Sequence, residues 1–243
     1  MRHIKEEEFR TFLQCAKRYQ EGDLHQARFN LRVARRTIES LFVKSIRNEL
    51  KDPGRALQGA LLRSLTVCNR EEGLLEPQLE ESHRQCTLWI SEFLEYLPFS
   101  RYVPVAGPFP SVVQVGKMAL QLEFSGILKM RENKTLHLVT FTPRADRHFL
   151  LNDPPTYLKI KLMDPITRSK YGSGNTKTRI HIFSMDKHNK IYYQGYDNRR
   201  VSNEPMKHLK AAGSLLVNGY AMPTLPCPQK TCKLYRRCNV LKD

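Results

Sequence analysis

The sequence lacks the features of membrane and secreted proteins. It has no run of about 18 consecutive apolar residues, so it predicts no transmembrane helix. The first residues, MRHIKEEEFR, lack the apolar segment of a secretory signal. Low-complexity tracts and repeats are also absent, and a chain of 243 residues with 40% hydrophobic and 26% charged residues can bury a full core. We therefore expect a cytoplasmic globular protein.

Acidic residues are scarce relative to basic ones. The chain has 24 Asp and Glu against 40 Lys and Arg, which gives a formal net charge of +16. The basic residues recur along the chain, as in RFNLRVARR (28–36) and KLYRR (233–237), rather than in one tail. Distributed positive charge attracts polyanions, of which nucleic acid is the commonest in a cytosol. The charge predicts a nucleic-acid-binding face, although a merely soluble basic protein has the same balance.

Residues 1–100 are predicted to form a helical lobe. Helices are expected over about 6–20, 24–41, 55–70 and 77–97, because apolar residues recur there every three or four positions. The polar face of the second helix carries Arg28, Arg32, Arg35 and Arg36. These arginines form either a solvated face or a face that follows phosphates.

Residues 101–243 are predicted to form a β core, followed by one helix and a cysteine motif. The prolines of YLPFSRYVPVAGPFPS (96–111) interrupt the helical pattern, so strands are expected from about residue 112. The later segments are a meander over 112–130 and 135–143, a strand or helix over 155–163, a strand pair over 173–196 and a helix over 203–220. The pattern as a whole indicates a mixed α/β fold.

Three of the six cysteines crowd together in CPQKTCKLYRRC, residues 227–238. In a reducing compartment such clusters indicate metal or cluster ligands rather than disulfides. Cys227, Cys232 and Cys238 supply three soft ligands, whereas a zinc or iron–sulfur site takes four. Cys15, followed by the basic segment AKRY, is the best candidate for the fourth ligand.

The other two cysteines, Cys68 and Cys86, lie inside predicted helices, where a free thiol usually packs. A site made of one early and three late cysteines would join the two ends of the chain. Such a site contributes folding free energy as a structural metal does.

Both ends of the sequence resemble a known family. IKEEEFRTFLQCAKRYQEG (4–22) is similar to the opening of the iron–sulfur nucleases of the RecB-like PD-(D/E)XK superfamily, which include CRISPR-adaptation exonucleases and AddB nuclease domains. GYAMPTLPCPQKTCKLYRRC (219–238) is similar to their ending, although the first two cysteines of its triplet stand farther apart than is usual there. The resemblance implies a PD-(D/E)XK-like core and a 4Fe-4S cluster, with zinc as the alternative. The ligands that it implies are Cys15, Cys227, Cys232 and Cys238.

Active members of this family hold a divalent metal with an Asp on one strand and a Glu on the next, followed by a Lys. In this sequence, SGILKM and LVTFTP place Lys129 at the Asp position, Thr140 at the Glu position and Thr142 at the Lys position. An ammonium group in place of a metal-binding carboxylate inverts the charge of the site. The resemblance therefore implies a degenerate site without catalytic residues.

We expect a nucleic-acid-binding, catalytically degenerate subunit of a larger DNA-processing or CRISPR-type complex, with DNA and proteins as partners. Two alternatives remain open: an active metal-dependent nuclease with relocated carboxylates, and a protein-interaction subunit without nucleic-acid contact. The candidate nucleic-acid contacts are Arg28, Arg32, Arg35, Arg36, Lys129, Arg131, Arg144, Arg147, Tyr193, Arg199 and Arg200.

Overall fold

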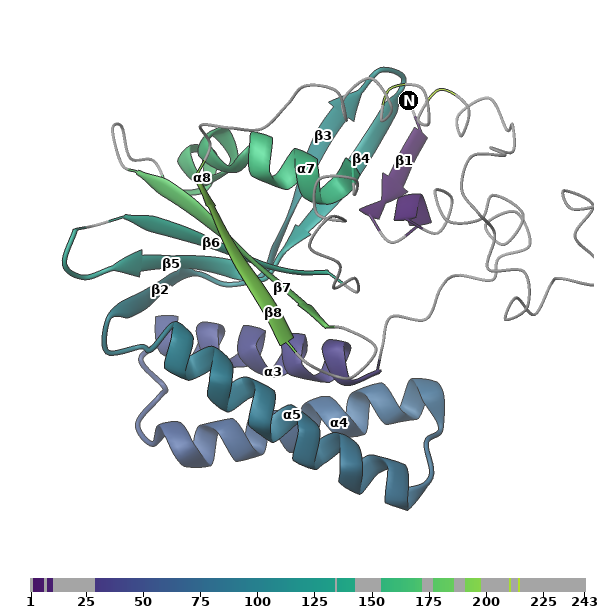
Figure 1. Cartoon of the computed structure of the whole chain (residues 1–243), viewed down its shortest axis with the longest axis vertical. Helices are drawn as coiled ribbons and strands as arrows, with labels where there is room; N and C mark the ends of the chain where they lie inside the picture. Colours follow the sequence, from purple (N-terminus) through teal and green to yellow (C-terminus); the bar gives the residue numbers. More distant parts are fainter. Residues whose placement is uncertain are drawn as a thin grey trace, which may run out of the picture.

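The computed structural model describes residues 2–6, 8–10, 29–133, 135–142, 154–171, 177–185 and 191–197, together with residues 210 and 214. Within these ranges the chain is a mixed α/β protein, as the sequence predicts, and its strands form two β-sheets (Figure 1). None of the described helices is long and apolar enough to cross a membrane. Nearly all of the helix expected over 203–220, and all of the cysteine motif, lie outside the described residues.

Three long helices form one layer of the fold. They are α3 (Phe29–Ile46), α4 (Pro53–Glu72) and α5 (Glu76–Tyr96). These bounds confirm the helices expected over 55–70 and 77–97, and the described part of the helix expected over 24–41. The side chain of Asp52 caps the start of α4, and Gly73 ends it in a left-handed conformation. Because α5 begins directly after this turn, α4 and α5 form a hairpin.

Five strands make the larger sheet. They are β2 (Tyr102–Ala106), β5 (Gly126–Met130), β6 (Leu136–Thr142), β7 (Thr178–Met185) and β8 (Ile191–Asp197). Their order is β2-β5-β6-β7-β8, and each neighbouring pair is antiparallel except β6–β7, which is parallel. Strands β7 and β8 confirm the strand pair expected over 173–196.

The parallel pair β6–β7 requires a long crossover connection. Two helices lie in that connection, α7 (Pro154–Lys161) and α8 (Met163–Tyr171). The segment 155–163, for which the sequence left strand and helix open, is therefore helical up to Lys161, and α8 was not predicted. Every residue of β6 is buried, because helices cover both faces of this part of the sheet.

A second sheet has three strands, β1 (Arg2–Lys5), β3 (Phe109–Val115) and β4 (Met118–Phe124). Its order is β1-β4-β3, and β1 lies parallel to β4. The sequence does not predict β1, because four residues are too few to show an alternating pattern. In the structure, β1 pairs with β4, which follows residue 100. The predicted division into a helical lobe (1–100) and a β core with its C-terminal segments (101–243) stays a prediction.

Two expectations about the strands are wrong. After the three long helices, strands begin at Tyr102 rather than near residue 112, although Pro104 lies in β2 and Pro110 in β3. Both are edge strands, where a residue without an N–H need not interrupt the hydrogen-bond ladder. The stretch 112–130 does not form one meander either, because β4 and β5 belong to different sheets and Ser125 alone separates them.

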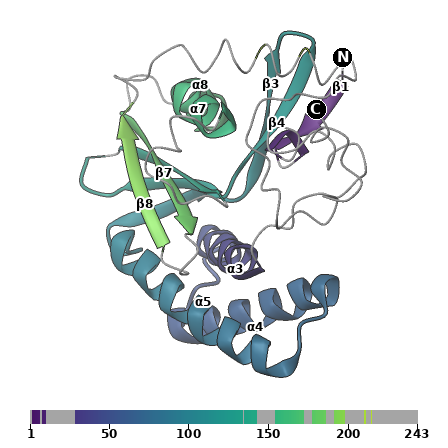
Figure 2. The ribbon, with the colours of Figure 1, turned by 45° about the vertical axis from the view of Figure 1, so that its right-hand side comes forward.

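Hydrophobic clusters fill the space on both sides of the five-stranded sheet. On one face, side chains of α7 and α8 pack with Leu138 and Ile180 of the sheet. On the other face, α3, α4 and α5 pack against Leu128, Val139 and Phe183. Figures 1 and 2 agree on this arrangement, with α7 and α8 on one side of the sheet and the three long helices on the other.

Gly126, the first residue of β5, lies where there is no room for a side chain. A Cβ atom there would come within 2.6 Å of the Ala106 carbonyl oxygen and 2.6 Å of the Phe42 ring. Glycine is therefore required where Phe42 of α3 packs against the start of β5.

We predict that Gly126→Ala lowers the free energy of unfolding by about 1–3 kcal/mol, because the added methyl group overpacks a core that cannot expand freely. Gly59→Ala is the matched control, since nothing lies within 4 Å of the added atom. In the interior of α4 this control should raise the free energy of unfolding by about 0.5–1 kcal/mol. Urea unfolding followed by circular dichroism measures both, and equal values for the two variants would contradict the close approach.

Candidate nucleic-acid interface

Three of the expected nucleic-acid contacts, Arg32, Arg35 and Arg36, lie on the polar side of α3. Residues of the opposite side, such as Leu31 and Ile38, are buried in the core. This division of the helix leaves the arginines at the boundary between α3 and α4.

The arginines line a groove between α3 and α4 with a volume of about 530 Å³. We call it the arginine groove, and its lining residues are Arg32, Arg35, Arg36, Glu39, Ser40, Ala60, Arg63, Ser64, Val67 and Glu123. Arg63 comes from α4 and Glu123 from β4, so the groove exists because the two helices meet the smaller sheet. Four arginines against two glutamates leave an excess of positive charge in it.

Arg35 bridges the two carboxylates of the arginine groove. Its Nε donates to Glu39 Oε1 at 2.7 Å, and its Nη2 donates to Glu123 Oε2 at 2.9 Å. The Ser125 hydroxyl donates to the same Glu39 oxygen at 2.8 Å. Burial alone would lower the pKa of Arg35, but Glu39 and Glu123 together raise it above its ordinary value. The guanidinium therefore stays charged.

Arg36 and Arg63 are the groove arginines most open to an outside anion. Arg36 Nη2 lies 3.7 Å from Glu71 Oε1, and 47% of its side chain is exposed. Exposed ion pairs of this kind stabilise a protein weakly, so a phosphate can replace Glu71 at little cost. Arg63 is exposed and pairs with none of the described carboxylates.

Next to the groove, a buried ion pair joins the start of the chain to α7. Lys159 Nζ lies 2.8 Å from Glu6 Oε2 and donates to Thr140 Oγ1 at 2.7 Å. Arg10 Nη2 lies 2.7 Å from the other Glu6 oxygen, and the Glu123 N–H donates to Glu6 Oε2 at 3.0 Å. Burial by itself raises the pKa of Glu6, but Lys159 and Arg10 lower it to about 2. Burial also lowers the pKa of Lys159, and Glu6 opposes that shift.

The three positions compared with the nuclease motif do not meet at one site. Lys129 pairs with Leu136 at one end of the β5–β6 ladder. Thr140 lies beyond the other end, where its hydroxyl donates to the Glu123 carbonyl oxygen at 3.1 Å. Thr142 is buried farther along β6. Within the ranges that the structure describes, no group of three or more His, Cys, Asp or Glu could hold a metal ion.

This arrangement favours the binding of an anion over the activation of water. Glu39 and Glu123 each contact Arg35, so their negative charge is already partly compensated. Arginines at the groove can instead form charge-assisted hydrogen bonds to phosphate oxygens.

Two of the remaining expected contacts, Lys129 and Arg131, do not line the arginine groove. Lys129 stands at the opposite end of β5 from Ser125, with its Nζ 5.9 Å from the centre of the Tyr171 ring, and Arg131 is exposed in the turn that follows. Tyr193 lies on β8, where its backbone pairs with Phe183. The expected residues outside the described ranges are Arg28, Arg144, Arg147, Arg199 and Arg200, together with Cys15, Cys227, Cys232 and Cys238.

Arg63, Glu39 and Lys159 were not among the residues singled out from the sequence. A signal for Arg63 was present, because the small residues Ala60 and Ser64 mark the side of α4 that packs near α3. No comparable signal exists for Lys159, because its role depends on Glu6, which lies near the start of the chain.

No model of a known protein family matches the chain, and no curated protein matches it. Among solved structures, a crystal structure of SSO0001 aligns with a TM-score of 0.32 and 12% sequence identity, covering 96% of this chain and 95% of that one. A likeness at this TM-score supports no argument about fold or function.

We predict that Glu6→Gln lowers the free energy of unfolding by about 3–5 kcal/mol, because it leaves the Lys159 ammonium buried without its carboxylate. The side chains of Glu6 and Lys159 are only 8% and 2% exposed. Chemical denaturation followed by circular dichroism measures the loss.

Glu81→Gln is the control for this prediction, because Glu81 pairs with Arg84 on the surface of α5 and its loss should leave stability nearly unchanged. The double variant Glu6→Gln/Lys159→Met should recover part of the loss, since it removes the Lys159 ammonium but leaves the buried Arg10 without the Glu6 carboxylate. Equal stability of Glu6→Gln and Glu81→Gln would contradict the importance of the buried pair.

Proposed function

We propose that the chain binds nucleic acid, with DNA as the first candidate, through the arginine groove and does not cleave it. The observation that carries the proposal is the position of Arg35, which contacts both groove carboxylates and would compete with a metal ion for them. A groove with four arginines supports phosphate binding, and the net charge of +16 supports attraction of a polyanion from a distance.

The proposal includes a PD-(D/E)XK-like core that has lost its chemistry. The resemblance of both ends of the sequence to RecB-like nucleases supports it, and a mixed sheet with helices on both faces is compatible with it. A subunit that binds without cutting needs other proteins to act on the nucleic acid. We therefore propose that it belongs to a larger DNA-processing or CRISPR-type complex.

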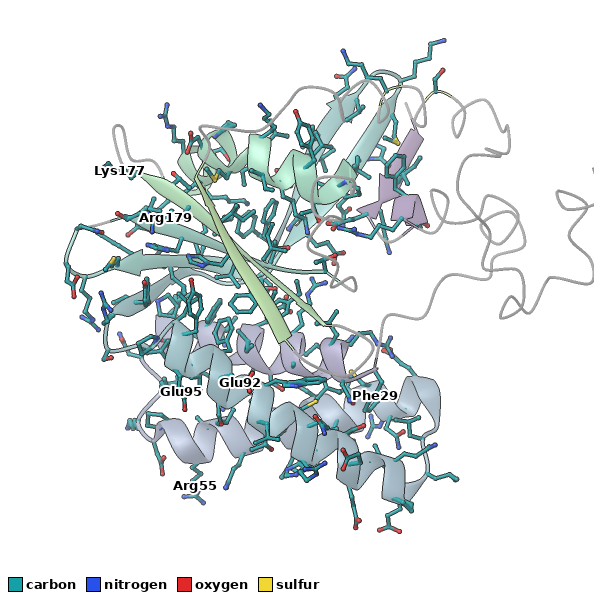
Figure 3. All side chains as sticks on the ribbon, in the orientation of Figure 1. Phe29, Arg55, Glu92, Glu95, Lys177 and Arg179 are labelled. Carbon is teal, nitrogen blue, oxygen red and sulfur yellow. The ribbon has the colours of Figure 1, made fainter. Side chains whose placement is uncertain are left out.

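We predict that Arg36→Gln/Arg63→Gln weakens DNA binding and reduces the slope of log K against log salt by about one per arginine, because each removes one phosphate contact. Fluorescence anisotropy of labelled single-stranded and duplex DNA, between about 50 and 200 mM salt, measures the slope. Arg55→Gln/Arg84→Gln is the control, since it removes the same charge from exposed positions outside the groove, and Figure 3 shows Arg55 on the outer side of α4.

Equal effects of the two double variants would contradict binding in the groove. Binding that does not depend on salt, or no binding at all, would favour the protein-interaction alternative. Cleavage in Mg²⁺ or Mn²⁺ that disappears in Glu39→Gln and Glu123→Gln would establish the nuclease with relocated carboxylates.

We further propose that Cys15, Cys227, Cys232 and Cys238 bind a 4Fe-4S cluster, with zinc as the alternative. The other two cysteines are poor ligands, which supports this set. Cys68 and Cys86 are buried as free thiols, as the sequence predicts. Burial and the nearby Cys68 raise the pKa of Cys86 to about 12, which disfavours the thiolate that a metal requires.

We predict that Cys232→Ser lowers soluble yield and metal content together, because a structural cluster contributes folding free energy. Anaerobic purification followed by iron, sulfide and zinc analysis should give about four irons per chain for the cluster. Cys68→Ala is the control and should retain the full metal content. Metal-free wild-type protein, or Cys232→Ser with full metal content and normal yield, would overturn the proposed site.

A further inference from the structure

The α4–α5 hairpin has a second groove, on a different side of α4 from the arginine groove. Its volume is about 630 Å³, and it runs along residues 62–70 of α4 and 76–83 of α5. Leu62, Leu65 and Leu79 form its apolar surface, and we call it the leucine groove. Figures 1 and 2 show that the end of the hairpin nearest its turn lies away from both sheets.

The leucine groove has the dimensions of a site for a helix. Its lining residues recur every three or four positions on both α4 and α5, so each helix contributes one continuous face. The stretch 62–70 is about 12 Å long, which corresponds to roughly two turns of a helix laid along it. Recognition of this kind uses apolar anchors of the partner at positions i, i+3 or i+4, and i+7.

Leu62 makes the leucine groove an unusual surface. Its side chain is 56% exposed, and Leu75 at the tip of the hairpin is 70% exposed. Exposed apolar side chains beside a groove are a feature of interaction sites. Leu65 is 7% exposed and forms the floor on which an anchor side chain can rest.

The charge around the leucine groove differs from that of the whole molecule. The segment EEGLLEPQLEE (71–81) contains five Glu and no Lys or Arg, in a chain whose net charge is +16, and two of the five are already paired, Glu71 with Arg32 and Arg36 and Glu81 with Arg84. Glu76 and Glu80 line the groove and pair with none of the described basic residues, while Arg70 lines the α4 side. A partner that complements this charge therefore carries Lys or Arg side chains where it lies beside Glu76 and Glu80 of α5.

We propose that the leucine groove is a docking site for a basic amphipathic helix of another protein. The apolar face of that helix would cover Leu62, Leu65 and Leu79, and its Lys or Arg residues would lie along Glu76 and Glu80. This inference goes beyond the proposed nucleic-acid binding and does not depend on it, because the two grooves use different faces of α4.

A library of random helical peptides displayed on phage, selected on the full chain, tests the proposal. The selected peptides should share apolar residues at i, i+3 or i+4, and i+7, and should be enriched in Lys and Arg. Leu62→Glu should weaken the binding of a selected peptide by about tenfold or more, because it places a charge on the apolar surface that the peptide covers. Val112→Glu is the matched control, since Val112 is 55% exposed on β3, outside the groove.

A second pair of variants tests the charge of the partner. Glu80→Lys should weaken the selected peptides by about tenfold, whereas Glu92→Lys should leave their affinity unchanged. Glu92 is exposed on the same helix, near the end of α5 away from the hairpin turn (Figure 3). Circular dichroism should show that all four variants remain folded.

Three results would overturn the proposal. The first is the absence of enriched peptides, or enrichment of peptides that bind Leu62→Glu as well as the wild type. The second is self-association of the wild-type chain in sedimentation that Leu62→Glu abolishes, since a second copy would then occupy the groove. The third is equal loss in Glu80→Lys and Glu92→Lys. Arg36→Gln/Arg63→Gln should bind the peptides normally, so failure of the proposed DNA binding is distinguishable from failure here.

Discussion

The buried ion pair between Glu6 and Lys159 is the constraint on which the surrounding structure depends. Glu6 comes from the start of the chain, Lys159 from α7, and the hydroxyl that Lys159 also contacts comes from Thr140 of β6. Because a buried charge must keep its partner, these elements cannot shift independently. The Glu123 N–H donates to the same carboxylate, which fixes the end of β4 and with it one residue that lines the arginine groove.

The same region supports the proposal of binding without catalysis. A metal-dependent nuclease needs carboxylates whose charge is available to a cation. Around β4 and α3 the available carboxylates already have cationic partners within the chain, namely Arg35 for Glu39 and Glu123, and Lys159 with Arg10 for Glu6. Cationic side chains thus neutralise these carboxylates in place of a metal ion. The exposed arginines of the groove have the charge and the hydrogen-bond donors that suit a phosphate.

Helix α4 contributes to two surfaces of opposite character. Its small residues Ala60 and Ser64, with Arg63, face the arginine groove, while Leu62 and Leu65 face the leucine groove. A single helix can do this because residues one or two positions apart point in different directions around its axis. The molecule can therefore present a polyanion site and an apolar docking site without a further structural element between them.

The sequence by itself determined the long helices, because apolar residues every three or four positions specify a helix and its buried side without reference to other elements. It also determined the arginine face of α3 and the strand pair β7–β8. Tertiary structure alone decided the strand β1, the helical state of 155–163, the position of Arg63 and the pairing of Glu6 with Lys159. These features depend on contacts between residues far apart in the chain, for which local periodicity carries no information. Four residues become a strand because β4 offers them hydrogen bonds, and Lys159 is buried because Glu6 reaches it.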